Sequence, residues 1–125
     1  MPRRSHVLVV EDDDATRQLL IAALGDAFVV VGARDMVQAL RWAATKPDVI
    51  VLDLALDRGS PTLPTVAQLV PILETRRLRV PPVIVLSALP DAGVIAATIG
   101  AVACFPKPFD VDALVERVRT LARGE

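Results

Sequence analysis

Short apolar runs alternate along the chain with longer segments in which apolar residues recur every three or four positions. Five runs rich in β-branched residues are predicted to be strands, at 6–11, 27–33, 48–54, 82–88 and 101–105. Continuous apolar runs of this length are typical of strands that are buried on both faces of a parallel sheet. The intervening segments have helical spacing. The alternation predicts an α/β fold, a (βα)5 chain whose doubly wound parallel five-stranded sheet carries helices on both faces.

Polar residues mark the ends of several predicted helices. Asp13 or Asp14 can cap the first helix, and Asp35 and Asp110 can cap the second and the last, because an aspartate oxygen accepts hydrogen bonds from the free backbone N–H groups at a helix start. Pro71 falls inside the third predicted helix, where a proline removes a backbone donor. We therefore expect this helix to kink or restart there.

Composition fits one domain with an aliphatic core. The 125 residues are 53% hydrophobic and only 3% aromatic. We expect a single domain over residues 1–125, with its core at about 6–123 and no output domain in this chain. Lys and Arg total 14 against 15 Asp and Glu, so the charge gives no support for direct nucleic acid binding or for binding to a membrane.

The sequence predicts no internal disulfide, membrane span or secretory signal, which indicates a cytoplasmic location. The single cysteine, Cys104, cannot form an internal disulfide, and we interpret it as a small buried side chain rather than a redox sensor. No apolar run approaches the ~20 residues of a membrane span, and the N-terminal apolar run is too short for a secretory signal.

Chemically active side chains collect where the predicted strands end. They are Glu11, Asp12 and Asp13 after the first strand, Asp53 in the third, Ser87 in the fourth and Lys107 after the fifth. In open α/β sheets the ligand site lies outside the carboxyl ends of the strands. Folding should therefore bring these carboxylates, the hydroxyl and the ammonium group together.

Such a set of side chains suits a magnesium ion and a phosphoryl group. Carboxylate oxygens are ligands that Mg²⁺ prefers, and the ion would offset the repulsion among Glu11, Asp12 and Asp53. A cation beside Asp53 would also screen an incoming phosphoryl group, so that Asp53 can attack phosphorus and form an aspartyl phosphate. Ser87 and Lys107 can then contact phosphoryl oxygens by a hydrogen bond and an ion pair.

Four motifs at these positions resemble those of the response regulator receiver domains of bacterial two-component signalling. They are VLVVEDDDATRQLL, KPDVIVLDLAL, PPVIVLSA and GAVACFPKPF, within a similarity that extends from about His6 to Arg123. The resemblance implies the flavodoxin-like strand order 2-1-3-4-5. It also implies that Asp53 is the phosphoacceptor and that the Lys107–Pro108 peptide bond is cis.

The same resemblance implies roles for the other site residues. Asp12 would be the main metal carboxylate, Glu11 would act mostly through water, and the backbone carbonyl of Ala55 would be another metal ligand. Ser87 and Lys107 would carry the switch and the charge pairing. The register of the acidic run is open, because a shift by one residue would make Asp12 and Asp13 the acidic pair.

The function implied is that of a phosphoacceptor domain. It would take a phosphoryl group from a sensor histidine kinase, a phosphotransfer protein or acetyl phosphate onto Asp53 with Mg²⁺, and would change its surface for a downstream effector or a fused output domain. It would catalyse only its own phosphorylation and dephosphorylation, and would not be an enzyme in the ordinary sense.

Three departures from the family pattern leave alternatives open. Cys104 stands where receivers usually have an aromatic residue, which weakens the usual route of signal relay. The segment 57–63 belongs to an unusually long loop, and is either a lid or partner contact or a tolerated insertion. The segment 87–107 is short and nearly uncharged, and its apolar residues Val94, Ile95 and Ile99 suggest a homodimer or partner contact through the fourth helix, fifth strand and fifth helix.

Two other functions therefore remain in consideration. One is a degenerate receiver that serves as a phosphorylation-independent docking or dimerisation module. The other is a flavodoxin-like small-molecule binder, although such a site prefers Gly, Ser and Thr to carboxylates at the first strand end.

Overall fold

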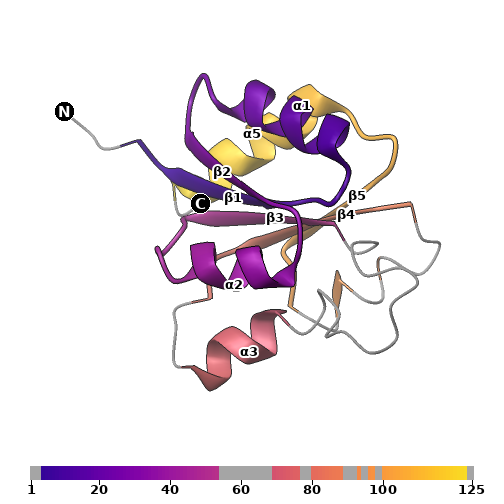
Figure 1. Cartoon of the computed structure of the whole chain (residues 1–125). Helices are drawn as coiled ribbons and strands as arrows, with labels where there is room; N and C mark the ends of the chain where they lie inside the picture. The colour runs from indigo at the N-terminus through magenta and orange to yellow at the C-terminus, as the bar shows by residue number, and fades with distance from the viewer. Residues whose placement is uncertain are drawn as a thin grey trace.

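A five-stranded parallel sheet lies between two layers of helices (Figure 1). The computed structural model describes residues 4–53, 69–76, 80–88, 93, 96–97 and 100–123. The strands are β1 (His6–Val10), β2 (Val29–Ala33), β3 (Val49–Asp53), β4 (Val83–Ser87) and β5 (Ala103–Pro106). Their order is β2-β1-β3-β4-β5, and every neighbouring pair is parallel. The predicted (βα)5 sheet and its strand order are confirmed.

The burial of the strands explains their sequence pattern. All five residues of β3 and of β4 are buried, and in β1 only His6 is partly exposed. These three strands occupy the centre of the sheet, where helices cover both faces, so a continuous apolar run is the sequence that suits them. The edge strands β2 and β5 are more exposed.

The helices divide between the two faces of the sheet. They are α1 (Asp14–Leu24), α2 (Met36–Ala43), α3 (Leu69–Thr75) and α5 (Val111–Ala122). Figure 1 shows α1 and α5 side by side on one face and α2 and α3 on the other. Most of the predicted fourth helix lies outside the described residues. Within the described part of the chain, no helix is long and apolar enough to span a membrane.

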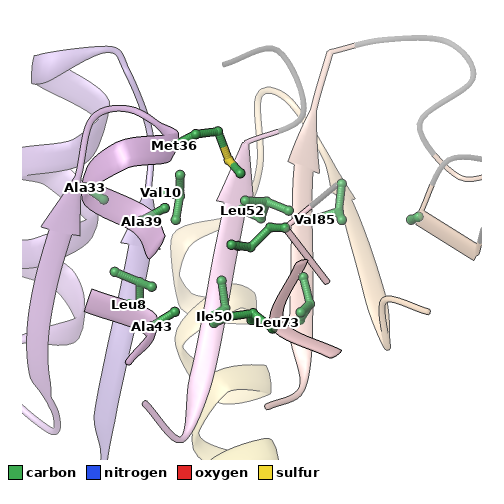
Figure 2. Close-up of a cluster of buried hydrophobic side chains, with 13 residues drawn as sticks. Leu8, Val10, Ala33, Met36, Ala39, Ala43, Ile50, Leu52, Leu73 and Val85 are labelled. Atoms are coloured by element: carbon green, nitrogen blue, oxygen red, sulfur yellow. The ribbon is translucent and has the colours of Figure 1, made fainter. Parts of the chain in front are cut away.

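Each face of the sheet has its own hydrophobic core, because successive residues of a strand point to opposite faces. Figure 2 shows the cluster between the sheet and α2 and α3. It includes Leu8, Val10, Ile50, Leu52 and Val85 from the strands, Met36, Ala39 and Ala43 from α2, and Leu73 from α3. The alternate strand residues, among them Val7, Val9, Val51 and Ile84, form the second cluster with residues of α1 and α5.

The helix starts follow the capping prediction. Asp13 is the N-cap of α1 and accepts a hydrogen bond from the backbone N–H of Thr16 at 2.8 Å, whereas Asp14 is the first residue of the helix. Asp35 and Asp110 cap α2 and α5 in the same way, each accepting from the N–H three residues further on. These caps fix where the chain turns from each strand end into the following helix.

Pro71 lies in α3, which is described over Leu69–Thr75. The residues before Leu69 lie outside the described ranges, so a kink or restart of the helix stays a prediction.

The expectation that Cys104 is buried is wrong, because its side chain is exposed. Cys104 lies on β5, an edge strand whose residues alternate between partly buried and exposed. Ala103 and Phe105 pack against the core on the α5 side, so the period of two places Cys104 on the opposite side of the strand. The apolar composition of the run did not reveal that only one face of this strand is well covered.

Candidate functional site

The carboxyl ends of four strands bring the candidate side chains together. Glu11 follows β1, Asp53 ends β3, Ser87 ends β4 and Lys107 follows β5. Within the described part of the chain, Glu11, Asp53 and Ser87 are the buried polar or charged residues, and each is 1% exposed. Burying polar side chains is unfavourable, so three of them at one edge of the sheet indicate a site rather than part of the core.

Three carboxylates form an acidic cluster, which consists of Glu11, Asp12 and Asp53. Each offers one oxygen, and these oxygens all lie within 4.8 Å of one another. Glu11 and Asp53 are buried, whereas Asp12 is exposed. An all-oxygen donor set that is open to solvent on one side suits Mg²⁺, which binds a few carboxylates and keeps several waters.

One oxygen of the acidic cluster supports a cation site independently. Glu11 Oε2 is buried and has no hydrogen-bond partner among the described residues. When the Glu11 carboxyl group is ionised, a buried oxygen of this kind is costly unless something positive contacts it. The residues present therefore fit a divalent cation.

Lys107 provides the positive charge of the site. Its Nζ donates a hydrogen bond to Glu11 Oε1 at 2.9 Å and lies 3.4 Å from Asp53 Oδ2. Its backbone N–H donates to the carbonyl of Ser87 at 2.9 Å, which ties the chain after β5 to the end of β4. The Lys107–Pro108 peptide bond is cis, as the resemblance implied.

These contacts change how the site ionises. Burial raises the pKa of the Glu11 carboxyl group from its ordinary 4.5 to about 8, and the adjacent Asp53 carboxylate adds to the rise, while Lys107 opposes it. Burial alone would lower the pKa of Lys107, but its hydrogen bond to Glu11 and the charge of Asp53 more than compensate and raise it. At neutral pH the Glu11 carboxyl group therefore largely keeps its proton in the metal-free chain, while Lys107 stays charged.

The cap at the start of α1 bears on the register of the acidic run. Asp13 Oδ2 accepts hydrogen bonds from the backbone N–H and the hydroxyl of Thr16, at 2.8 Å and 2.6 Å, and these bonds lower the pKa of Asp13. Asp13 is thus occupied as a helix cap, while Glu11 and Asp12 approach Asp53. The geometry favours Glu11 and Asp12 over Asp12 and Asp13 as the acidic pair.

Some predicted features lie outside the described residues. They are the carbonyl of Ala55, the segment 57–63, and the side chains of Val94, Ile95 and Ile99. Ser87 lies where it was predicted, buried at the end of β4. Sequence reasoning gave Arg17 no role in the site, yet its Nη1 donates to the carbonyl of Glu11 at 2.9 Å. Its position one turn into the helix that follows the acidic run was the available signal.

The fold and the acidic cluster beside a lysine define a signalling receiver domain. The family model of the response regulator receiver domain matches residues 7–119. The chain belongs to this family.

Individual relatives agree with this assignment. The chain is 37% identical over 123 residues to the KDP operon transcriptional regulatory protein KdpE of Escherichia coli, covering 95% of this chain and 52% of that protein. It is also 37% identical over 130 residues to the transcriptional regulatory protein CseB of Streptomyces coelicolor, covering 98% of this chain and 51% of that protein. The chain thus spans about half the length of these curated relatives.

A solved structure supports the same fold. The receiver domain of the Francisella response regulator 1452 superimposes with a TM-score of 0.79 at 30% sequence identity, covering 95% of this chain and 97% of that chain.

Proposed function

We propose that this receiver domain accepts a phosphoryl group on Asp53 with the help of Mg²⁺ and that the modification changes its surface for a protein partner. The observation that carries the proposal is the convergence of the acidic cluster and Lys107. Asp53 Oδ2 lies 3.4 Å from Lys107 Nζ and belongs to a group of three carboxylates that fits a cation. A nucleophilic carboxylate, a cation site and a fixed ammonium group are the parts that phosphoryl transfer needs.

Glu11, Asp12 and Asp53 would hold the Mg²⁺, and the carbonyl of Ala55 is proposed as a further ligand. When bound, the ion would neutralise charge on the phosphoryl oxygens and reduce their repulsion from the acidic cluster. An Asp53 oxygen would attack phosphorus while the bond from phosphorus to the leaving group breaks. The electron pair of that bond would stay with the leaving group, a histidine nitrogen of a kinase or phosphotransfer protein or an oxygen of acetyl phosphate.

Lys107 and Ser87 would contact the phosphoryl group on Asp53. Phosphorylation adds a charge of about −1.5 to −2 and three acceptor oxygens. Lys107 would then pair with a phosphoryl oxygen in place of Glu11, and the Ser87 hydroxyl would donate to another. Because the N–H of Lys107 already bonds the carbonyl of Ser87, a movement of one segment is passed to the other. We infer that the surface around the ends of β4 and β5 changes as a result.

The partners follow from this role. We propose a sensor histidine kinase or phosphotransfer protein as the phosphoryl donor. The downstream partner would be a protein effector or an output domain, in keeping with relatives that are transcriptional regulatory proteins of about twice this length. A homodimer through the fourth helix, fifth strand and fifth helix stays a prediction.

Intact-mass spectrometry after incubation with acetyl phosphate and Mg²⁺ tests the proposal. The wild-type chain should gain one phosphoryl group, and Asp53→Asn should gain none. Asp112→Asn, which alters an exposed aspartate in the first turn of α5, is the matched control and should be labelled like the wild type. A folded wild-type chain that takes up no label would instead favour the phosphorylation-independent docking module. Labelling that persists in Asp53→Asn would place the phosphoacceptor elsewhere.

A further inference from the structure

Arg17 reaches from α1 to the backbone of the acidic run. Its Nη1 donates a hydrogen bond to the carbonyl oxygen of Glu11 at 2.9 Å, and its Nη2 pairs with the carboxylate of Asp14. The Arg17 side chain is only 16% exposed, whereas Asp14 is 79% exposed. The guanidinium group therefore bridges the start of α1 and the end of β1 from a largely buried position.

The neighbouring strand leaves room for this side chain. Gly32 of β2 lies under the Arg17 stem, and a Cβ at position 32 would lie 3.0 Å from Arg17 Cδ and 2.9 Å from Ile21 Cδ1. Real Cβ atoms are essentially never found closer than 3.0 Å to another heavy atom. With the side chains in their present positions, a Cβ at position 32 would crowd Ile21 and the Arg17 stem, and glycine avoids this contact.

The carbonyl that accepts the hydrogen bond from Arg17 belongs to the peptide group that joins Glu11 to Asp12. The side chains of these two residues are therefore attached to the two ends of one planar unit. The preceding peptide group is also held, because the N–H of Glu11 donates to the carbonyl of Ala33 in β2 at 2.9 Å. Rotation of the Glu11–Asp12 peptide would move both carboxylates relative to Asp53, and the bond from Arg17 opposes that rotation.

We propose that Arg17 is a positioning residue for the cation site, which holds the Glu11–Asp12 peptide in the orientation that directs both carboxylates toward Asp53. This inference rests on the proposed function, since it concerns the same site. Arg17 would act through the backbone carbonyl of Glu11, in the way that outer hydrogen-bond partners orient the ligands of a metal.

The role requires the shape of the guanidinium group as well as its charge. Two nitrogens of the planar fork contact Glu11 and Asp14 at the same time. A lysine keeps the positive charge but has one nitrogen on a flexible stem, so it cannot hold both partners in a fixed geometry. Arg17→Lys therefore separates positioning from simple charge balance.

The test is a Mg²⁺ titration of the ¹⁵N-labelled chain followed by NMR. Wild type, Arg17→Lys and Arg17→Gln are compared with Arg41→Lys, a matched control at an exposed arginine of α2. Both Arg17 variants should bind Mg²⁺ about tenfold more weakly, the lower end of the loss seen when outer partners of metal ligands are removed. Before any Mg²⁺ is added, the amide resonance of Asp12 should also shift in both, because its nitrogen shares the peptide group with the bonded carbonyl.

The outcomes separate this inference from the proposed function. If the wild type binds Mg²⁺ and the folded Arg17 variants bind it within twofold, Arg17 has only a structural role and the inference is wrong. An unmoved Asp12 amide in those variants also overturns it. If the folded wild type binds no Mg²⁺, the proposed function and this inference both fail.

Discussion

Replacing Glu11 by glutamine should stabilise the metal-free chain at neutral and mildly alkaline pH. Burial raises the pKa of Glu11 from 4.5 in its ordinary state to about 8 in the folded chain, with a further contribution from Asp53. Below about pH 4.5 the Glu11 carboxyl group is protonated in both the folded and the unfolded chain, so its ionisation does not change the free energy of unfolding. Between about pH 4.5 and 8 the unfolded chain releases this proton and the folded chain keeps it, so stability falls as the pH rises.

The size of this effect follows from the pKa difference. One pKa unit corresponds to about 1.4 kcal/mol, so the change from 4.5 to about 8 sets an upper limit of about 5 kcal/mol on the stability lost by pH 8. Relaxation of the site and entry of water should reduce the measured loss of stability to about 2 kcal/mol. Glu11→Gln keeps a polar group of the same size and removes the ionisation, so the loss should disappear.

Urea unfolding followed by circular dichroism, with a chelator present, measures the effect at pH 5, 6.5 and 8. The free energy of unfolding of the wild type should fall across this series by about 2 kcal/mol more than that of Glu11→Gln. Comparing the two chains removes the contribution of every other titrating group. Glu74→Gln, at an exposed glutamate of α3, is the matched control and should follow the wild type. Equal pH dependence in the wild type and Glu11→Gln would refute the reasoning.

Three further predictions test the cap, the core and the edge strand. Asp13→Ala should lower the free energy of unfolding by about 1 kcal/mol through loss of the N-cap, yet leave Mg²⁺ affinity within twofold. Asp12→Ala should abolish Mg²⁺ binding. If a Mg²⁺ titration shows the reverse, the acidic pair is Asp12 and Asp13. Leu52→Ala should cost about 2 to 5 kcal/mol in urea unfolding, because Leu52 is fully buried between the sheet and the helices, and a loss below about 1 kcal/mol would contradict this packing. Cys104 in the native chain should react with a soluble thiol reagent nearly as fast as in urea, and strong protection would contradict its exposure.

The features predicted best from the sequence are those set by the chemistry of a few neighbouring residues or by the spacing of apolar positions. The central strands could be located because residues buried on both faces must all be apolar, and the caps because an aspartate oxygen can accept hydrogen bonds from the free N–H groups of a helix start. Cys104 was misjudged for the opposite reason, since an apolar residue on an edge strand does not reveal which of its faces is covered. The strand ends located Asp53 and Lys107 at one edge of the sheet, but not the contact between Lys107 and Glu11, which joins residues 96 positions apart.

Lys107 lies unequally between two buried carboxyl groups and offsets part of the cost of burying them. Its ammonium group lies closer to Glu11 Oε1, at 2.9 Å, than to Asp53 Oδ2, at 3.4 Å. One ammonium group thus contacts two buried carboxyl groups, and within the described residues Glu11 Oε2 has no hydrogen-bond partner. Ionising Glu11 is therefore unfavourable in the metal-free chain, and a cation that contacts the ionised group would offset part of that cost, because a ligand that binds only the folded chain adds its binding free energy to stability. The cost of ionising Glu11 and the proposed affinity of the acidic cluster for Mg²⁺ therefore involve the same carboxyl group, which is why Glu11 is the residue whose replacement should gain stability and lose function together.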